Sequence, residues 1–302
     1  MGHLMSSNEL TAGKNQELEA RYTWQRLVEL RADPVRGEFD ATHLKEINRR
    51  IFQDLPGLGL SDATPGQYRS AVADGNDWVK TRKLETVGIR LSVAYSPMDS
   101  KALNRLDDIL GQADPTGLSK LTTRAFTVAI GKLYSEVDYI HPFLDGNSRT
   151  LREFTRQLAE RAGYTLNWKR FSQTPAGRDI LYIARDRSVN ELALPNIQHE
   201  DTRRLIMLSM DQVEGNRDLP ALLQDVIQAV GEPSWEQQLA EKEARAVAVQ
   251  TGPANLMEPS LEEQLREQES SDYLVRVALD KPDGGQHNPQ HQDSYDEPGM
   301  DH

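Results

Sequence analysis

The chain contains no cysteine among its 302 residues. Disulfide bridges, zinc sites built on thiolates and a cysteine nucleophile are therefore excluded. The chain also lacks any apolar run close to the ~20 residues that cross a bilayer, so we expect no membrane span. Its first ten residues have neither the basic nor the apolar region of a secretory signal, and a cytoplasmic location is the expectation that follows.

Positive charge is also scarce, since 35 Lys and Arg stand against 47 Asp and Glu and give a formal net charge of −12. Nonspecific binding to DNA or RNA depends on cationic side chains that release counterions from the phosphates, so we expect no nonspecific binding to nucleic acid. Hydrophobic residues make up 37% of the chain, below the ~45–50% of an average globular protein. Part of the length is therefore expected to be solvated tail.

The pattern of apolar residues divides the chain into four regions. Residues 1–14 are small and polar and are expected to be a disordered N-terminus. Residues 15–196 show the helical periodicity of a folded domain, and residues 197–270 continue it as a C-terminal helical extension. Residues 271–302 end in an acidic stretch without Lys or Arg, which cannot bury enough apolar surface to fold and is expected to be a disordered tail.

Helical spacing dominates the central region. The expected helices cover residues 15–31, 39–55, 102–110, 118–137, 151–163 and 175–187. Residues 56–77 hold several Pro and Gly and predict a long irregular loop. Alternating apolar residues over 89–95, together with a short run at 78–81, predict a β-hairpin. The expected fold class is mainly α with one small hairpin.

One segment, H-P-F-L-D-G-N-S-R-T-L-R at residues 141–152, contains the side chains that could take part in catalysis or ligand binding. His141 follows a helix and precedes a proline. A histidine titrates near neutrality and can take a proton from a hydroxyl. The D-G-N-S run leads directly into a helix whose free backbone N–H groups form an anion site, and Gly146 lets an oxygen approach the backbone closely.

Charged side chains reinforce this anion site. Arg149 and Arg152 share a face near the N-terminus of the new helix, where positive charge is unfavourable unless an anion is present. Asp145 adds a hard oxygen ligand suited to magnesium that is shared with phosphate oxygens. A base, an anion site, a metal carboxylate and two guanidinium groups in one short segment indicate phosphoryl or nucleotidyl transfer.

The segment resembles the signature of the Fic family, H-x-F-x-[D/E]-G-N-G-R-x-x-R, and the similarity extends upstream to GEFDATHLKEINRRIFQDL and GQYR. The resemblance implies a Fic-type helical bundle with a β-hairpin flap over the site. It also implies a protein adenylyltransferase, which uses ATP and Mg²⁺ and moves AMP to a Ser, Thr or Tyr hydroxyl of a target protein.

The resemblance also assigns roles to individual positions. His141 would be the catalytic general base, Asp145 the magnesium ligand and Phe143 a buried anchor of the loop. Arg149 would take the β-phosphate and Arg152 the γ-phosphate. The residues expected to bind the nucleotide are Gly146, Asn147, Ser148, Arg149 and Arg152.

One position departs from the signature, because Ser148 stands where the family usually has glycine. A serine narrows the allowed backbone angles and places a hydroxyl near the phosphates. Two alternatives therefore stay open. The same site would transfer another phosphate-containing group, or the chain is a degenerate copy that binds nucleotide or a partner without turnover.

Many Fic proteins are held inactive by a glutamate in the pattern [S/T]-x-x-x-E-[G/N]. This chain has Glu214-Gly215, but Met210 stands at the position that requires Ser or Thr. We therefore expect no built-in inhibitory glutamate to reach Arg152. The resemblance then implies a toxin or effector that is restrained by a separate, small antitoxin-like protein.

Overall fold

Helices make up most of the fold in the computed structural model, which describes residues 7–231, 240 and 242–245. The α-helices are α1 (Ser7–Ala32), α2 (Ala41–Phe52), α3 (Ser100–Leu110), α4 (Pro115–Leu118), α5 (Thr123–Ile140), α6 (Asn147–Arg161), α7 (Lys169–Ser172), α8 (Pro175–Ala193), α9 (Glu200–Asp211) and α10 (Leu219–Leu223). Short 3₁₀ turns lie at Pro56–Leu58 and Leu194–Asn196. The expected mainly α fold class is confirmed. None of the described helices is both long and apolar enough to span a bilayer.

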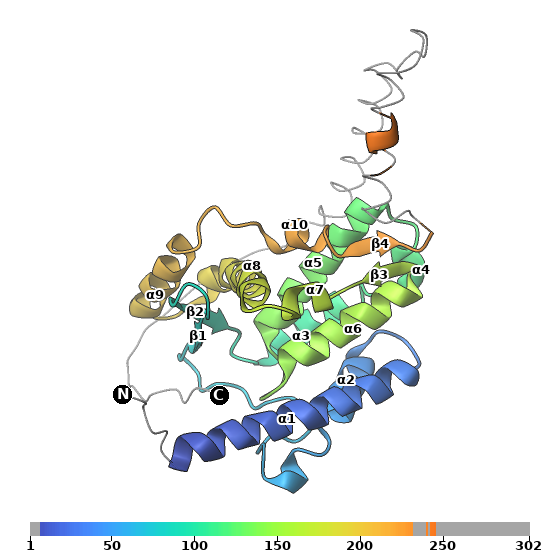
Figure 1. Ribbon diagram of the computed structural model, residues 1–302. Helices are drawn as coiled ribbons and strands as arrows, with labels where there is room; N and C mark the ends of the chain where they lie inside the picture. The colour runs from blue at the N-terminus through green and yellow to red at the C-terminus, as the bar shows by residue number, and fades with distance from the viewer. Residues whose placement is uncertain (1–6, 232–239, 241, 246–302) are drawn as a thin grey trace, which may run out of the picture.

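The predicted β-hairpin is confirmed as β1 (Trp78–Lys83) and β2 (Arg90–Tyr95), which pair antiparallel. β2 packs against α8 and α9, and β1 forms the outer edge of the pair (Figure 1). A second antiparallel pair joins β3 (Tyr164–Leu166) to β4 (Ile227–Ala229). The sequence did not predict this pair, because strands of three residues are too short to show an alternating pattern.

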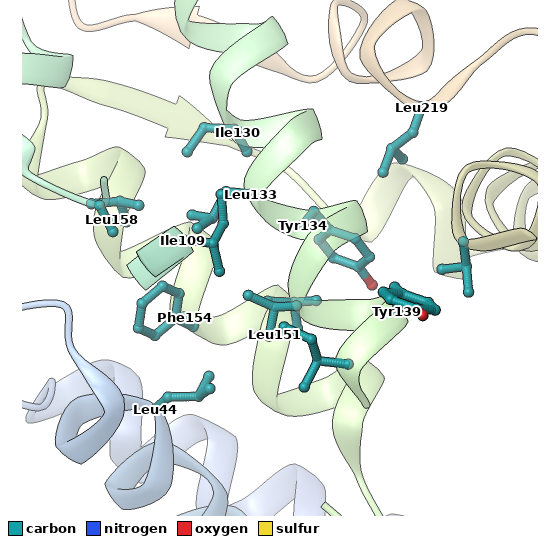
Figure 2. Close-up of a cluster of buried hydrophobic side chains, with 14 of the residues drawn as sticks. Leu44, Ile109, Ile130, Leu133, Tyr134, Tyr139, Leu151, Phe154, Leu158 and Leu219 are labelled. Carbon is teal, nitrogen blue, oxygen red and sulfur yellow. The ribbon is translucent and has the colours of Figure 1, made fainter. Parts of the chain in front are cut away.

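The core lies where α5 and α6 meet. Leu151, Phe154 and Leu158 recur at helical spacing along α6, and each is at most 2% exposed. Figure 2 shows them between Leu44 of α2 on one side and Ile130 and Leu133 of α5 on the other. This stripe fixes α6 against both neighbours. As a result, the C-terminal end of α5 and the N-terminal end of α6 are held close together, joined by the six residues 141–146.

The first helix begins earlier than the sequence predicted. α1 starts at Ser7, so residues 7–14 are helical rather than disordered. Residues 13–18 are exposed, whereas Leu30 is buried and Tyr22 and Leu27 pack against the core. Extending an existing helix costs far less free energy than nucleating one, so the packed half of α1 sustains the exposed half.

The C-terminal extension is continuous with the domain over its described part. β4 pairs with β3 across the predicted boundary at residues 196 and 197. α10 packs on α5, where Gly131 leaves room for Pro220, since a Cβ on Gly131 would lie 2.9 Å from Pro220 Cγ. Residues 197–229 therefore share the core of the preceding region. The rest of the predicted extension and the acidic tail at 271–302 fall almost entirely outside the described residues.

Gly146, which begins α6, is required by both its backbone and its surroundings. Its φ is +79°, a conformation that favours glycine, and a Cβ would lie 2.1 Å from Phe52 Cζ. Gly163 has a similar φ of +86°, but a Cβ there would meet no atom within 4 Å. A side chain at Gly163 would thus meet only the cost of the left-handed backbone, whereas a side chain at Gly146 would also clash with Phe52.

We expect Gly146→Ala to destabilise the fold more than Gly163→Ala. The left-handed conformation costs about 1–2 kcal/mol at either position, and displacement of the Phe52 ring adds about 1–3 kcal/mol at Gly146 alone. Urea unfolding of both variants measures the difference. Equal losses in the free energy of unfolding would show that Phe52 moves aside freely.

Candidate active site

Residues 141–146 form a tight connection whose shape depends on Asn147. The Asn147 side chain accepts a hydrogen bond from the Phe143 N–H at 2.9 Å and donates one to the Phe143 carbonyl at 2.6 Å. Phe143 is 2% exposed and packs on the Tyr68 ring, as the predicted anchor requires. The amide of Asn147 is therefore committed to the loop, which leaves only its backbone to meet a ligand.

Arg69, from the G-Q-Y-R sequence, holds the end of α5 in place. Its guanidinium donates to the carbonyls of Ser96 at 2.7 Å, His141 at 2.8 Å and Ile140 at 3.2 Å. The last carbonyls of a helix have no partner within the helix, and a cationic donor there satisfies them. Burial lowers the pKa of Arg69 to about 9. Arg69 thus joins the hairpin to the loop and fixes the backbone at His141.

The His141 ring is oriented by its neighbours so that one nitrogen stays available. It lies 4.0 Å from the Tyr95 ring and 5.4 Å from the Trp78 ring, measured between centroids. Its Nδ1 is 3.3 Å from the Asp138 carbonyl and 3.6 Å from Asp138 Oδ1. Nε2 has no hydrogen bond to the described residues. With the proton on Nδ1, Nε2 carries the lone pair of a base.

Asp138 raises the proton affinity of His141, but by less than burial lowers it. Its carboxylate receives two hydrogen bonds from Arg185, at 2.7 and 3.0 Å, and both side chains are 1% exposed. Burial alone would raise the pKa of Asp138, but Arg185 and the His141 hydrogen bond hold it below its ordinary value. Burial dominates at His141 and lowers its pKa to about 4. The imidazole is therefore neutral at physiological pH.

Arg185 also binds the side chain of Ser148, the serine that departs from the family signature. Its Nη1 donates to Ser148 Oγ at 3.3 Å. Ser148 lies in the first turn of α6, where the right-handed helical backbone accommodates a serine without strain. No side chain caps this turn, so its backbone N–H groups keep their capacity to bind an anion. Ser148 is thus compatible with the anion site.

The two arginines of the segment have different surroundings. Arg152 is largely buried, donates from Nε to the Ser148 carbonyl at 3.2 Å, and forms no ion pair with a described carboxylate. Desolvation lowers its pKa. Arg149 instead points to α1, where its guanidinium lies 2.5 Å from Glu19 Oε1 and 3.2 Å from Thr23 Oγ1. Sequence reasoning did not find Glu19, because no spacing relates two residues that lie so far apart.

Asp145, the candidate metal ligand, is exposed at the tip of the loop. Its Oδ2 accepts a hydrogen bond from Ser61 Oγ at 2.9 Å. The described residues contain no group of three His, Asp or Glu side chains arranged to hold a metal ion. A cation at Asp145 would therefore draw its other ligands from water and phosphate oxygens, a coordination that suits Mg²⁺.

The structure brings most of the predicted residues to one place. His141, Asp145, Gly146 and Ser148 surround the start of α6, and Arg152 follows one turn later. Arg149 is the exception, since Glu19 holds it against α1. The sequence reasoning also missed Asp138 and Arg185. Asp138 lies three residues before His141, one helical turn away, which was a usable signal, whereas Arg185 had none.

We expect the imidazole of His141 to titrate far below an ordinary histidine. Its lowered pKa of about 4, against 6.5 for a free side chain, means that the unfolded chain binds a proton between these values and the native fold does not. Stability should therefore fall as pH decreases from 6.5 toward 4, relative to a His141→Gln variant. NMR titration of the ring, assigned with that variant, and urea unfolding at several pH values measure both effects. A ring that titrates near 6.5 would contradict the burial argument.

The part of the chain that holds this site is similar to known proteins. A model described as the Fic/DOC family matches residues 38–159. Protein adenylyltransferase VbhT of Bartonella schoenbuchensis is 28% identical over 155 residues, which cover 51% of this chain and 28% of that protein. A protein adenylyltransferase of Bartonella henselae is 28% identical over 147 residues, 48% of this chain and 26% of its own length. The chain thus matches only about a quarter of each relative.

Solved structures give more distant matches. One is the N-terminal Fic domain of a VirB-translocated Bep effector protein from Bartonella quintana with bound ADP, at 18% identity and a TM-score of 0.43 over 75% of this chain and 88% of that one. Another is BepC from Bartonella tribocorum with bound AMPPNP, at 17% identity and a TM-score of 0.46 over 72% of this chain and 88% of that one.

The family match contains the whole of the 141–152 segment and the helices α2, α3 and α5 that position it. The resemblance noted from the signature is confirmed. Residues 38–159 of the chain match the Fic/DOC family model.

Proposed function

We propose that this chain is a protein adenylyltransferase that moves AMP from ATP to a Ser, Thr or Tyr hydroxyl of a target protein. The observation that carries the proposal is the neutral His141, whose Nε2 has no hydrogen bond to the described residues. It lies beside the uncapped start of α6 and the partly buried Arg152, which forms no ion pair with a described carboxylate. The relatives named protein adenylyltransferase support this reaction type over the part of their length that the chain matches.

The reaction follows from the roles of these groups. Nε2 of His141 takes the proton of the target hydroxyl, whose oxygen attacks the α-phosphorus of ATP. The bond from the α-phosphorus to the oxygen that bridges to the β-phosphate breaks, and pyrophosphate leaves. The N–H groups at the start of α6 and the Arg152 guanidinium bind the phosphates and stabilise the charge that develops on them. Asp145 would hold Mg²⁺, which neutralises phosphate charge when bound.

Mass spectrometry tests the proposal directly. The protein is incubated with Mg²⁺, a cell lysate as the source of target, and ATP labelled either in the adenine or in the γ-phosphate. We expect adenine label, but no γ-label, on a protein hydroxyl. Transfer of γ-label alone would identify a kinase, and ATP binding without either transfer would identify a nucleotide-binding module; both would overturn the proposal.

His141→Ala is the matched variant for this experiment. We expect it to abolish transfer while it leaves the ATP dissociation constant within a few-fold, because the base acts on the hydroxyl and stabilises only the transition state. Isothermal titration calorimetry measures the affinity. A variant that still transferred AMP at a tenth of the wild-type rate would show that another group is the base.

The ion pair between Glu19 and Arg149 leads to a second test. If Arg149 binds the β-phosphate, the Glu19 carboxylate competes with that phosphate for the guanidinium. We expect Glu19→Gln to tighten ATP binding by about 2–5-fold, the range typical of partly exposed ion pairs. Glu17→Gln, at an exposed position on the same helix, is the control and should have no effect. Unchanged affinity in Glu19→Gln would show that Arg149 does not bind the nucleotide.

Restraint by a separate antitoxin-like protein remains part of the proposal. No described carboxylate forms an ion pair with Arg152, so a partner is free to supply one there. Co-expression with a candidate inhibitor that carries such a glutamate, followed by measurement of AMP transfer, tests this point.

A further inference from the structure

One face of the hairpin strand β1 carries three large side chains. Strand residues alternate between two faces, so Trp78, Lys80 and Arg82 share one face. All three are partly buried, whereas Thr81 and Lys83 on the other face are exposed. This inward face of the hairpin therefore carries an aromatic ring, an ammonium group and a guanidinium group, and its Trp78 ring lies 5.4 Å from the His141 ring of the 141–146 loop.

Two of these side chains have partners within the protein. Arg82 donates to Asp186 at 2.8 Å and lies 4.0 Å from the Tyr182 ring. Trp78 packs against Arg69, at 3.7 Å, and against the His141 ring. Both residues are thus accounted for by the fold.

Lys80 differs because no described carboxylate or carbonyl binds its ammonium group. Its Nζ lies 4.7 Å from the centroid of the Trp78 ring. Burial lowers the pKa of Lys80, and Asp145 and Asp138 oppose this through their charges. The ammonium in turn contributes to lowering the pKa of His141. Lys80 therefore lies within electrostatic reach of both the base and the metal-ligand candidate.

A partly buried cation without a counterion is unfavourable, and an anionic ligand that binds beside it removes this cost. The phosphates of ATP are the anions that the proposed function brings to this site. Of these, the α-phosphate must lie nearest His141, because the hydroxyl that His141 deprotonates attacks the α-phosphorus. The β- and γ-phosphates lie further along, toward the arginines of α6.

We infer that Lys80 binds the α-phosphate of the nucleotide and so completes its binding site from the flap side. This inference rests on the proposed function. An ammonium on a non-bridging oxygen of the α-phosphate would also offset the negative charge that builds there as the target hydroxyl attacks. The phosphates would then be bound from two sides, by the start of α6 and Arg152 on one side and by Lys80 of β1 on the other.

Nucleotide binding to Lys80→Met, measured by calorimetry with AMP, ADP and ATP in the presence of Mg²⁺, tests the inference. We expect all three affinities to fall by a similar factor of about ten or more, since each nucleotide has an α-phosphate and a charged hydrogen bond is lost. Lys83→Met is the matched control, because it removes the same charge from the outward face of the same strand and should leave binding unchanged. Lys80→Arg, which keeps the charge, should recover most of the affinity.

The outcomes separate the inference from the proposed function. If the wild-type protein binds no ATP, the proposed function fails. If the wild type binds and Lys80→Met binds equally well, or weakens ATP but not AMP, Lys80 does not contact the α-phosphate. An effect on target modification alone would assign Lys80 to a carboxylate of the target and would likewise overturn the inference. The melting temperature of each variant serves as the folding control, and Lys80→Gln replaces Lys80→Met if that variant unfolds.

Discussion

The buried ion pair between Asp138 and Arg185 organises the site. Both side chains are 1% exposed and lie 2.7 Å apart, and a pair so far from water is seldom a net source of stability. Its value lies in what it does to His141. Asp138 orients the imidazole through Nδ1 and Arg185 keeps Asp138 ionised, while burial of the ring lowers the pKa of His141. The imidazole is thus oriented by a carboxylate without losing its lone pair.

The same pair joins three helices at one point. Asp138 comes from α5 and Arg185 from α8, and Arg185 also binds Ser148 at the start of α6.

His141 itself has a left-handed backbone, with φ of 49°, which is unfavourable for a residue other than glycine. The three hydrogen bonds from Arg69 hold this conformation. The strain at the base is therefore balanced by contacts that the loop alone does not provide.

The sequence predicted local features well and distant pairings poorly. It located the hairpin, most helices and the 141–152 segment, because periodicity and motif spacing are local signals. It placed the start of α5 too early, at residue 118, since the apolar run conceals a break before Thr122, whose side chain caps the helix. Arg185 and Glu19 approach the site only through the packing of α8 and α1, and no sequence spacing reveals such contacts.

The side chains at the site are mainly positive, whereas the chain as a whole is negative. The formal net charge is −12, yet Lys80 and Arg152 meet no described carboxylate, and Arg149 meets only the partly exposed Glu19. Local charges and helix ends, not the net charge, set the potential that a bound ligand experiences. The negative net charge of the chain therefore does not exclude an anion site. Because Glu19 is the one described acid paired with these cations, it is also where a bound phosphate would have to compete with the protein.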